Sequence, residues 1–94
     1  ASLAGLILLM DIRHPLKPQD LAVLEWCNHA GVAVHVLLNK SDKLSRGPAT
    51  ATLHQVTAAI AKRGWTASAQ LFSALKQDGA EQAWQVLADW LQLE

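Results

Sequence analysis

The chain has 94 residues, of which 51% are hydrophobic and 17% charged, and its formal net charge at pH 7 is zero. This length allows at most one small domain, and the charge balance gives no bulk attraction to nucleic acid or to an acidic membrane. The single cysteine excludes an intramolecular disulfide, and no apolar run approaches the ~18 residues needed to cross a bilayer. We therefore expect a cytoplasmic protein without a membrane partner.

The first half of the chain predicts two strands joined by a helix. A continuous apolar run at 5–11 indicates a strand covered on both faces, as in a parallel sheet. Two prolines mark the loop that follows, and a helix is expected from Pro18 to about Ala30, with Gly31 as its natural end. The run at 32–38 predicts a second buried strand.

The second half of the chain repeats this alternation. A helix is expected to begin after Ser45 and to end near Gly64, and a weaker strand is predicted at 66–72. A last helix follows, with Asp78 expected to cap it and Glu81 three residues later, close to a capping box. The order is therefore β-α-β-α-β-α, which predicts an α/β fold with a three-stranded parallel sheet of doubly wound type.

Aromatic and histidine side chains are interpreted as structural. In the last helix Trp84, Leu87 and Leu91 are predicted to face the core, with Trp90 beside them. His35 lies in an apolar strand and is expected to be a packed, hydrogen-bonded histidine.

Trp26 and Trp65 are interpreted as core or boundary residues and not as an RNA-stacking platform. His29 and His54 have no second ligand at metal spacing, so no zinc site is predicted. Cys27 shares the apolar face of its helix and has no partner that would make it reactive.

Polar residues gather at the predicted carboxyl ends of the three strands. They fall at 11–17, 39–43 and 73–76, and ligands of such sheets bind at this edge. In the middle cluster, Asp42 can accept two parallel hydrogen bonds, as from the N1–H and amino group of guanine. Asn39 supplies a donor and an acceptor, and the aliphatic stem of Lys40 can lie over a base.

The sequence "NKSD" at 39–42 resembles the N-K-x-D guanine-specificity motif of GTPases, and "SALK" at 73–76 resembles the S-A-x loop that accompanies it. The resemblance implies that the N–H of Ala74 meets the guanine O6 and that Ser73 supports the Asp42 carboxylate. Leu75 or Lys76 would flank the base opposite Lys40. The implied guanine-binding residues are Asn39, Lys40, Asp42, Ser73, Ala74, Leu75 and Lys76.

Longer stretches are similar to the EngB family of bacterial GTPases. They are "LLMDIRHPLKPQD", "LLNKSDKLSRG" and "FSALKQDG", followed by a tryptophan-bearing helix, and together they span nearly the whole chain. The resemblance implies a Ras-like P-loop GTPase fold, binding of GTP and GDP with Mg²⁺, and hydrolysis of GTP by the parent protein. It also implies a role of the parent in assembly of the large ribosomal subunit, needed for normal cell division (septation).

Two family elements do not occur in these residues. The phosphate loop G-x-x-x-x-G-K-[ST] is absent from the sequence, and the D-x-x-G element has no counterpart, since Asp78-Gly79 has the wrong place and spacing. The usual magnesium ligands are therefore missing as well, and phosphoryl transfer depends on such groups. We expect residues 1–94 to be a single partial GTPase domain, its C-terminal, guanine-recognition half, without catalytic residues. Its exposed sheet edge would favour self-association.

Several alternatives stay open. Asp11 and Arg13 form either a loop-stabilising ion pair, which we favour, or a nucleotide contact, and His14 has the same status. The basic residues Lys43 and Arg46 beside Lys40 are either a solvated loop or an RNA-facing edge.

Two other functional classes compete with nucleotide binding. A non-catalytic α/β protein-interaction fragment of the same fold is the stronger rival. A phosphoacceptor receiver domain would need Asp11, Ser41 and Lys76 together with an acidic pair before the first strand, and the chain has no such pair.

Overall fold

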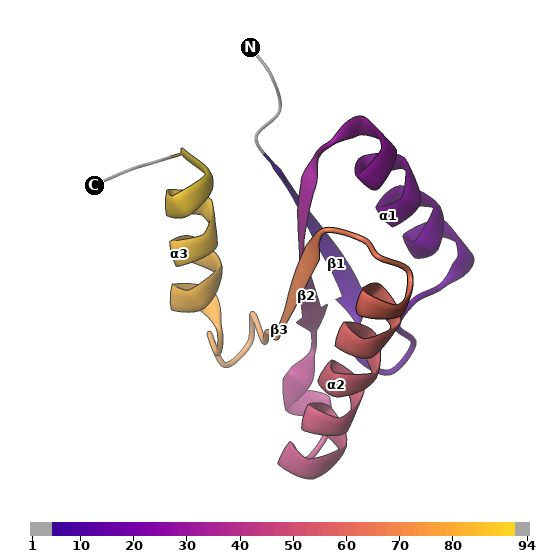
Figure 1. Ribbon diagram of the computed structural model, residues 1–94. Coiled ribbons are helices and arrows are strands. Elements are labelled where there is room, and N and C mark those ends of the chain that lie inside the picture. The colour runs from indigo at the N-terminus through magenta and orange to yellow at the C-terminus, as the bar shows by residue number, and fades with distance from the viewer. Residues whose placement is uncertain (1–4, 92–94) are drawn as a thin grey trace.

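The computed structural model describes residues 5–91 and shows an α/β arrangement of three strands and three main helices (Figure 1). In chain order the elements are β1 (Gly5–Asp11), α1 (Pro18–Ala30), β2 (Ala33–Asn39), the 3-10 turn η1 (Ser41–Lys43), α2 (Arg46–Lys62), β3 (Ala67–Leu71) and α3 (Ala80–Leu91). The predicted order β-α-β-α-β-α is confirmed, and each predicted strand lies within one or two residues of its observed bounds.

The three strands form a parallel sheet whose spatial order, β1-β2-β3, equals their order in the chain. Asp11 of β1 and Asn39 of β2 are register partners, so the two strands end side by side. Figure 1 shows α1 and α2 on one side of the sheet and α3 on the other. This is the arrangement that right-handed crossovers of the same direction produce.

The core lies between the sheet and the helices α1 and α2. It contains Val34, Val36 and Leu38 of β2, which alternate along the strand and face α1 and α2. Leu24 of α1 and Val56 of α2 pack against them and are 1% and 0% exposed. Burial of this apolar surface is the main favourable term that holds the sheet against these two helices.

The ends of α1 follow from its flanking residues. Pro18 occupies the first turn, where its missing N–H leaves no hydrogen bond unmade. Asp20 accepts a hydrogen bond from the backbone N–H of Lys17 at 3.1 Å, which satisfies a free donor of the helix start. At the other end Gly31 adopts a φ of +73° and its N–H bonds Asn28 O, so the helix ends where it was predicted to end.

Two predictions about burial were wrong. The strand at 5–11 was expected to be covered on both faces, but Leu9 of β1 is 56% exposed and the only buried residue of that strand is Met10. Trp84 and Leu91 of α3 were expected in the core but are 64% and 62% exposed. The helix instead turns Ala83, one residue and about 100° away from Trp84, toward the rest of the molecule.

The other tryptophans divide between boundary and surface. Trp26 of α1 is 64% exposed, so its assignment to the core or boundary was also wrong. Trp65 packs against the core cluster and is partly buried. Trp90 is partly buried with Gly5 of β1 beneath its ring, because a Cβ built at Gly5 would lie 2.6 Å from ring carbons.

The expected capping of α3 by Asp78 was wrong as well. The helix begins at Ala80, and the first helical hydrogen bond runs from Ala83 N to Gly79 O at 3.0 Å. Asp78 instead exchanges backbone hydrogen bonds with Ser73 at 3.0 and 3.1 Å and closes the preceding loop. Within residues 5–91, no helix has both the length and the apolarity required to cross a membrane.

Candidate functional site: a slot at the carboxyl edge of the sheet

Backbone hydrogen bonds tie the three polar loops together at the carboxyl edge of the sheet. Ile12 N donates to Asn39 O, and Ser41 N donates to Phe72 O, both at 3.0 Å. The loop after each strand is thus bonded to the loop or strand end beside it. The convergence of the polar clusters at 11–17, 39–43 and 73–76 on one edge is confirmed.

The loop after β2 has a strained, well-defined backbone. Lys40 adopts the left-handed region with a φ of +63°, which costs a non-glycine residue roughly 1–2 kcal/mol. The Asn39 side chain offsets this by accepting a hydrogen bond from the Lys40 N–H at 2.9 Å. The short turn Ser41–Lys43 then follows, and it places Asp42 toward the loop after β3. Strain of this kind is often retained at functional sites.

Asp42 is oriented by Ser73. The hydroxyl of Ser73 donates to Asp42 Oδ1 at 2.7 Å, and the Ser73 Oγ itself accepts from the Lys76 N–H at 3.1 Å. Ser73 is fully buried, so its geometry is fixed by the surrounding chain. This hydrogen bond is the main reason that the pKa of Asp42 lies below its ordinary value, and nearby Lys43 and Lys76 lower it further. Asp42 is therefore an ionised, partly exposed acceptor.

A cavity of about 250 Å³ lies beside this carboxylate. Its lining residues are Asn39, Lys40, Asp42, Lys43, Ala74 and Leu75. We call it the edge slot. It brings together all of the residues implied for guanine binding except Ser73, which supports Asp42 from the buried side, and Lys76.

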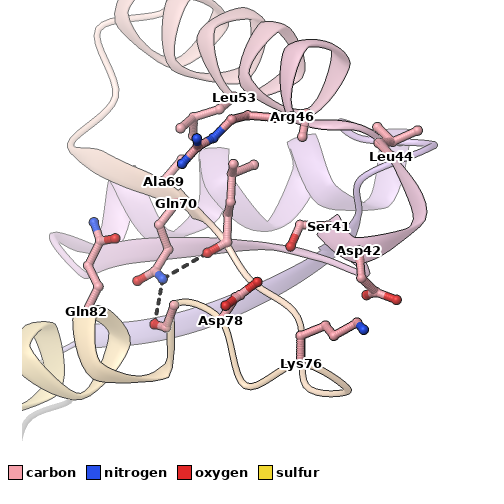
Figure 2. Close-up of a pocket in the computed structure, with 13 residues that line it drawn as sticks. Ser41, Asp42, Leu44, Arg46, Leu53, Ala69, Gln70, Lys76, Asp78 and Gln82 are labelled. Carbon is pink, nitrogen blue, oxygen red and sulfur yellow. Dashed lines mark hydrogen bonds between the residues drawn. The ribbon is translucent and has the colours of Figure 1, made fainter.

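A second, larger cavity of about 660 Å³ lies between α2, the outer edge of β3 and the loop before α3. Figure 2 shows Asp42 and Lys76 at one end of it and Gln70 and Gln82 at the other. Lys76 lines this cavity and not the edge slot, so Leu75 is the residue of the pair that the structure places near Lys40.

An ion pair joins the loop after β1 to the loop after β2, and a second one lies within the first loop. Arg13 contacts Asp11 with two side-chain hydrogen bonds of 3.2 and 3.0 Å, and Lys40 Nζ lies 3.6 Å from Asp11 Oδ2. The Asp11–Arg13 ion pair is thus confirmed. The hydrogen bonds from Arg13 hold the pKa of Asp11 far below its ordinary range, and the charge of Lys40 adds to this. The anchored Lys40 spans the gap between the loops after β1 and β2.

His35 is the buried histidine that was expected, at 1% exposure. Its Nδ1 lies 2.7 Å from Ser68 Oγ and its Nε2 lies 2.6 Å from Gln70 Oε1. Sequence inspection did not single out Gln70. One signal was available: Gln70 is a polar residue in a predicted strand, two residues before the "FSALK" segment. The neighbouring strand carries another polar residue, His35, with which it could form a hydrogen bond. No group of three metal-ligating side chains occurs within the part of the chain that the structure describes.

Comparison with known proteins places this edge in context. No family model matches the chain. A probable GTP-binding protein EngB from Methylococcus capsulatus is 50% identical over 93 residues, which is 98% of this chain and 44% of that protein. Proteins of the same name from Azoarcus sp. and Dechloromonas aromatica are 52% identical over 91 residues and 48% identical over 94 residues. Over nearly all of its length, the chain is thus similar to part of the EngB proteins.

These matches cover only part of each relative. The chain spans less than half of the length of these relatives, 44% in two of them and 43% in the third. Its three parallel strands and flanking helices correspond to a fragment of the P-loop GTPase fold. The receiver-type alternative would use Asp11 as its phosphoacceptor, and in the structure this carboxylate is paired with Arg13 and Lys40.

Proposed function

We propose that this chain is the guanine-recognition half of a GTP-binding protein of the EngB type. The observation that carries the proposal is the hydrogen bond from buried Ser73 to Asp42, which aims an ionised carboxylate at the edge slot. The relatives carry the name GTP-binding protein EngB, and the match covers nearly all of this chain.

The chemistry of the slot suits the edge of a guanine base. Asp42 accepts from the N1–H and the exocyclic amino group, and the Ala74 N–H donates to O6. The aliphatic stem of Lys40 and the Leu75 side chain, which is 75% exposed at the slot, cover the two faces of the ring. An adenine base presents the wrong donors and acceptors, so it would leave Asp42 unpaired, and this gives selectivity.

The phosphates and Mg²⁺ require residues outside these 94. A P-loop cradles phosphates with backbone N–H groups and a lysine, and the sequence contains no such loop. Among the described residues no side-chain cluster fits a magnesium ion. We infer that the complete protein supplies both and hydrolyses GTP to GDP, and that residues 1–94 form one partial domain that only reads the base.

The proposal extends to the setting of the complete protein. The family resemblance supports a cytoplasmic protein that acts on the large ribosomal subunit and is needed for septation. Lys40 and Lys43 line the slot and Arg46 lines the larger cavity, and the three exposed side chains provide a small basic surface at which RNA would be contacted.

The guanine assignment is tested by Asp42→Asn in the full-length protein. The amide replaces an acceptor by a donor, so affinity for GDP should fall by roughly 100-fold as charged hydrogen bonds are lost, and xanthosine diphosphate should become the preferred ligand. Titration calorimetry with both nucleotides measures this.

The matched control is Asp78→Asn, because Asp78 lines the larger cavity and not the edge slot. This variant should keep the wild-type preference. Undiminished selectivity for GDP in the Asp42→Asn protein would refute the assignment.

A further inference from the structure

We propose that Gln70 is a positioning residue that holds the loop 73–78 where the edge slot needs it, without touching the nucleotide. The inference rests on the proposed function, because this loop carries the Ala74 N–H that would read the base. It adds a determinant of base recognition that is buried in the interior of the molecule and does not line the slot.

Gln70 ties the two ends of the loop together. Its side chain is 1% exposed, and its Nε2 donates to Leu71 O at 3.1 Å and to Gly79 O at 2.8 Å. Figure 2 shows these two hydrogen bonds as dashed lines from the Gln70 amide nitrogen. Leu71 is the last residue of β3, and Gly79 immediately precedes α3. One amide group therefore fixes the separation of the entry and exit of the loop.

Gly79 is shaped to receive this amide. It adopts a φ of +85°, and a Cβ built on it would lie 2.6 Å from Gln70 Nε2 and in collision with Leu71 O. Any other residue would push the loop exit away from Gln70 and would also strain the backbone. The close approach of Gln70 and Gly79 thus depends on both residues.

His35 fixes the orientation of the Gln70 amide. Both amide hydrogens of Gln70 point to carbonyl oxygens, so its Oε1 must be the acceptor toward His35 Nε2, which carries the proton. A flipped amide would set Oε1 against two carbonyl oxygens. In the described residues no buried side-chain nitrogen or oxygen lacks a partner, so the arrangement is fully satisfied.

The loop transmits this position to the slot in two short steps. Gln70 bonds Leu71 and Gly79, and between these two residues Ser73 and Asp78 exchange backbone hydrogen bonds. Ser73 then donates to Asp42. A shift of the loop exit therefore moves the Ser73 hydroxyl, the orientation of the Asp42 carboxylate and the position of the Ala74 N–H.

Stability alone does not account for the arrangement. Replacing hydrogen-bonded polar partners by apolar groups of similar shape is often neutral or stabilising, and the sheet face on which His35 and Gln70 lie could be apolar. An apolar residue, however, could not donate hydrogen bonds to the carbonyl oxygens of both Leu71 and Gly79. We therefore assign the retained amide to the geometry of the loop.

The test uses the full-length protein and the variant Gln70→Glu. Glutamate keeps an acceptor for His35 Nε2 but places an oxygen where two carbonyls need a donor. We expect the Kd for a fluorescent GDP analogue to rise by about tenfold in the folded protein. The midpoint of urea unfolding, measured in parallel, reports any loss of stability separately.

Ser68→Ala is the matched control, because it removes the other hydrogen bond of His35, two residues along the same strand, without contact to the loop. It should leave the Kd for GDP within twofold of wild type. Gly79→Ala perturbs the same contact from the loop side and should raise the Kd for GDP even where Gln70→Glu fails to fold.

The outcomes separate this inference from the proposed function. A wild-type protein that does not bind GDP refutes the proposed function. A wild-type protein that binds GDP, with Gln70→Glu or Gly79→Ala binding equally well, overturns the role of Gln70 alone. An equal rise in Kd for Ser68→Ala also overturns it, since the network would then act only on the fold.

Discussion

Asp42 is the residue whose electrostatics the structure defines best. Its carboxylate accepts from a hydroxyl that is wholly buried, and two lysines lie close enough to favour its charge. A group held in this way is ionised before any ligand arrives and needs little reorganisation to accept two donors. The free energy of binding a base can then be used for discrimination and not for ordering the site.

The Ser73 hydroxyl should control the titration of Asp42. Ser73→Ala removes the largest cause of the lowered pKa, so the pKa of Asp42 should rise toward the ordinary value. An NMR titration of the Asp42 carboxyl carbon measures this, with Asp11 as the internal control because its partners are Arg13 and Lys40.

The Ser73–Asp42 hydrogen bond should also make the free energy of unfolding depend on pH. Because the folded pKa of Asp42 is lowered, its contribution is fully present above the ordinary pKa and is lost as the pH falls through the folded pKa. The stability deficit of Ser73→Ala should therefore be largest at neutral pH and should shrink in acid. An unchanged pKa of Asp42 in the variant would contradict the assignment.

At the scale of the elements, β1 is the least protected strand. It forms one edge of the described sheet, and Leu9 lies 56% exposed on the face opposite α1 and α2. Unpaired edges beside exposed apolar residues are sites of self-association. The strand β2, in contrast, is buried from Val34 to Leu38 and has a neighbour on each side.

We predict that the 94-residue chain self-associates through β1. Leu9→Lys should weaken this association by about tenfold, since burial of a leucine contributes ~1.5–3 kcal/mol. Sedimentation velocity over a range of concentrations measures it.

Trp26→Gln is the control, because Trp26 is also a well-exposed apolar residue, at 64%, but lies on α1. A chain that stays monomeric at every concentration, or a Leu9→Lys variant that associates like the wild type, would rule out this edge.

At the scale of the whole molecule, the proposed function gives the chain a base-reading edge, while its sequence contains no phosphate-binding loop. A GTP molecule bound here would contact the protein with its base, while its charged triphosphate stayed in water. Few contacts would then offset the entropic cost of association, so the affinity should be low.

We therefore expect the 94-residue chain to bind GTP negligibly and not to hydrolyse it. Titration calorimetry should show no heat of binding in the micromolar range, while the full-length protein titrated in the same buffer should bind. Micromolar affinity of the short chain would show that the base slot suffices by itself.

Local signals in the sequence predicted the fold well where particular residues mark the beginning or the end of an element. Pro18 and Gly31 bound α1 because one lacks a donor and the other adopts the left-handed region, and neither effect needs the rest of the molecule. The positions of Trp84 and Gln70 were missed for the opposite reason. Which face of α3 packs inward, and which polar residue of β3 finds partners, depends on neighbours far away in the chain.

The site was predictable to a similar degree. Asn39, Lys40 and Asp42 are adjacent in the sequence, and their common loop followed from the strand before them. The pairing of Asp42 with Ser73 came from resemblance to GTPases, since 31 residues separate the two partners and no periodicity connects them. The Asp11–Lys40 contact was not foreseen, because it joins two loops that are 29 positions apart in the sequence and no local pattern connects them.

The identity of strand order and chain order has a consequence for how the slot is assembled. Each strand pairs only with its neighbour in the sequence, so every pairing closes one crossover that contains a single α-helix. The slot itself needs the last of these segments, since Ala74 and Leu75 form one of its walls. Under the proposed function, a chain truncated before Ser73 would keep the residues of all three strands but lose one wall of the slot and with it the site for the base.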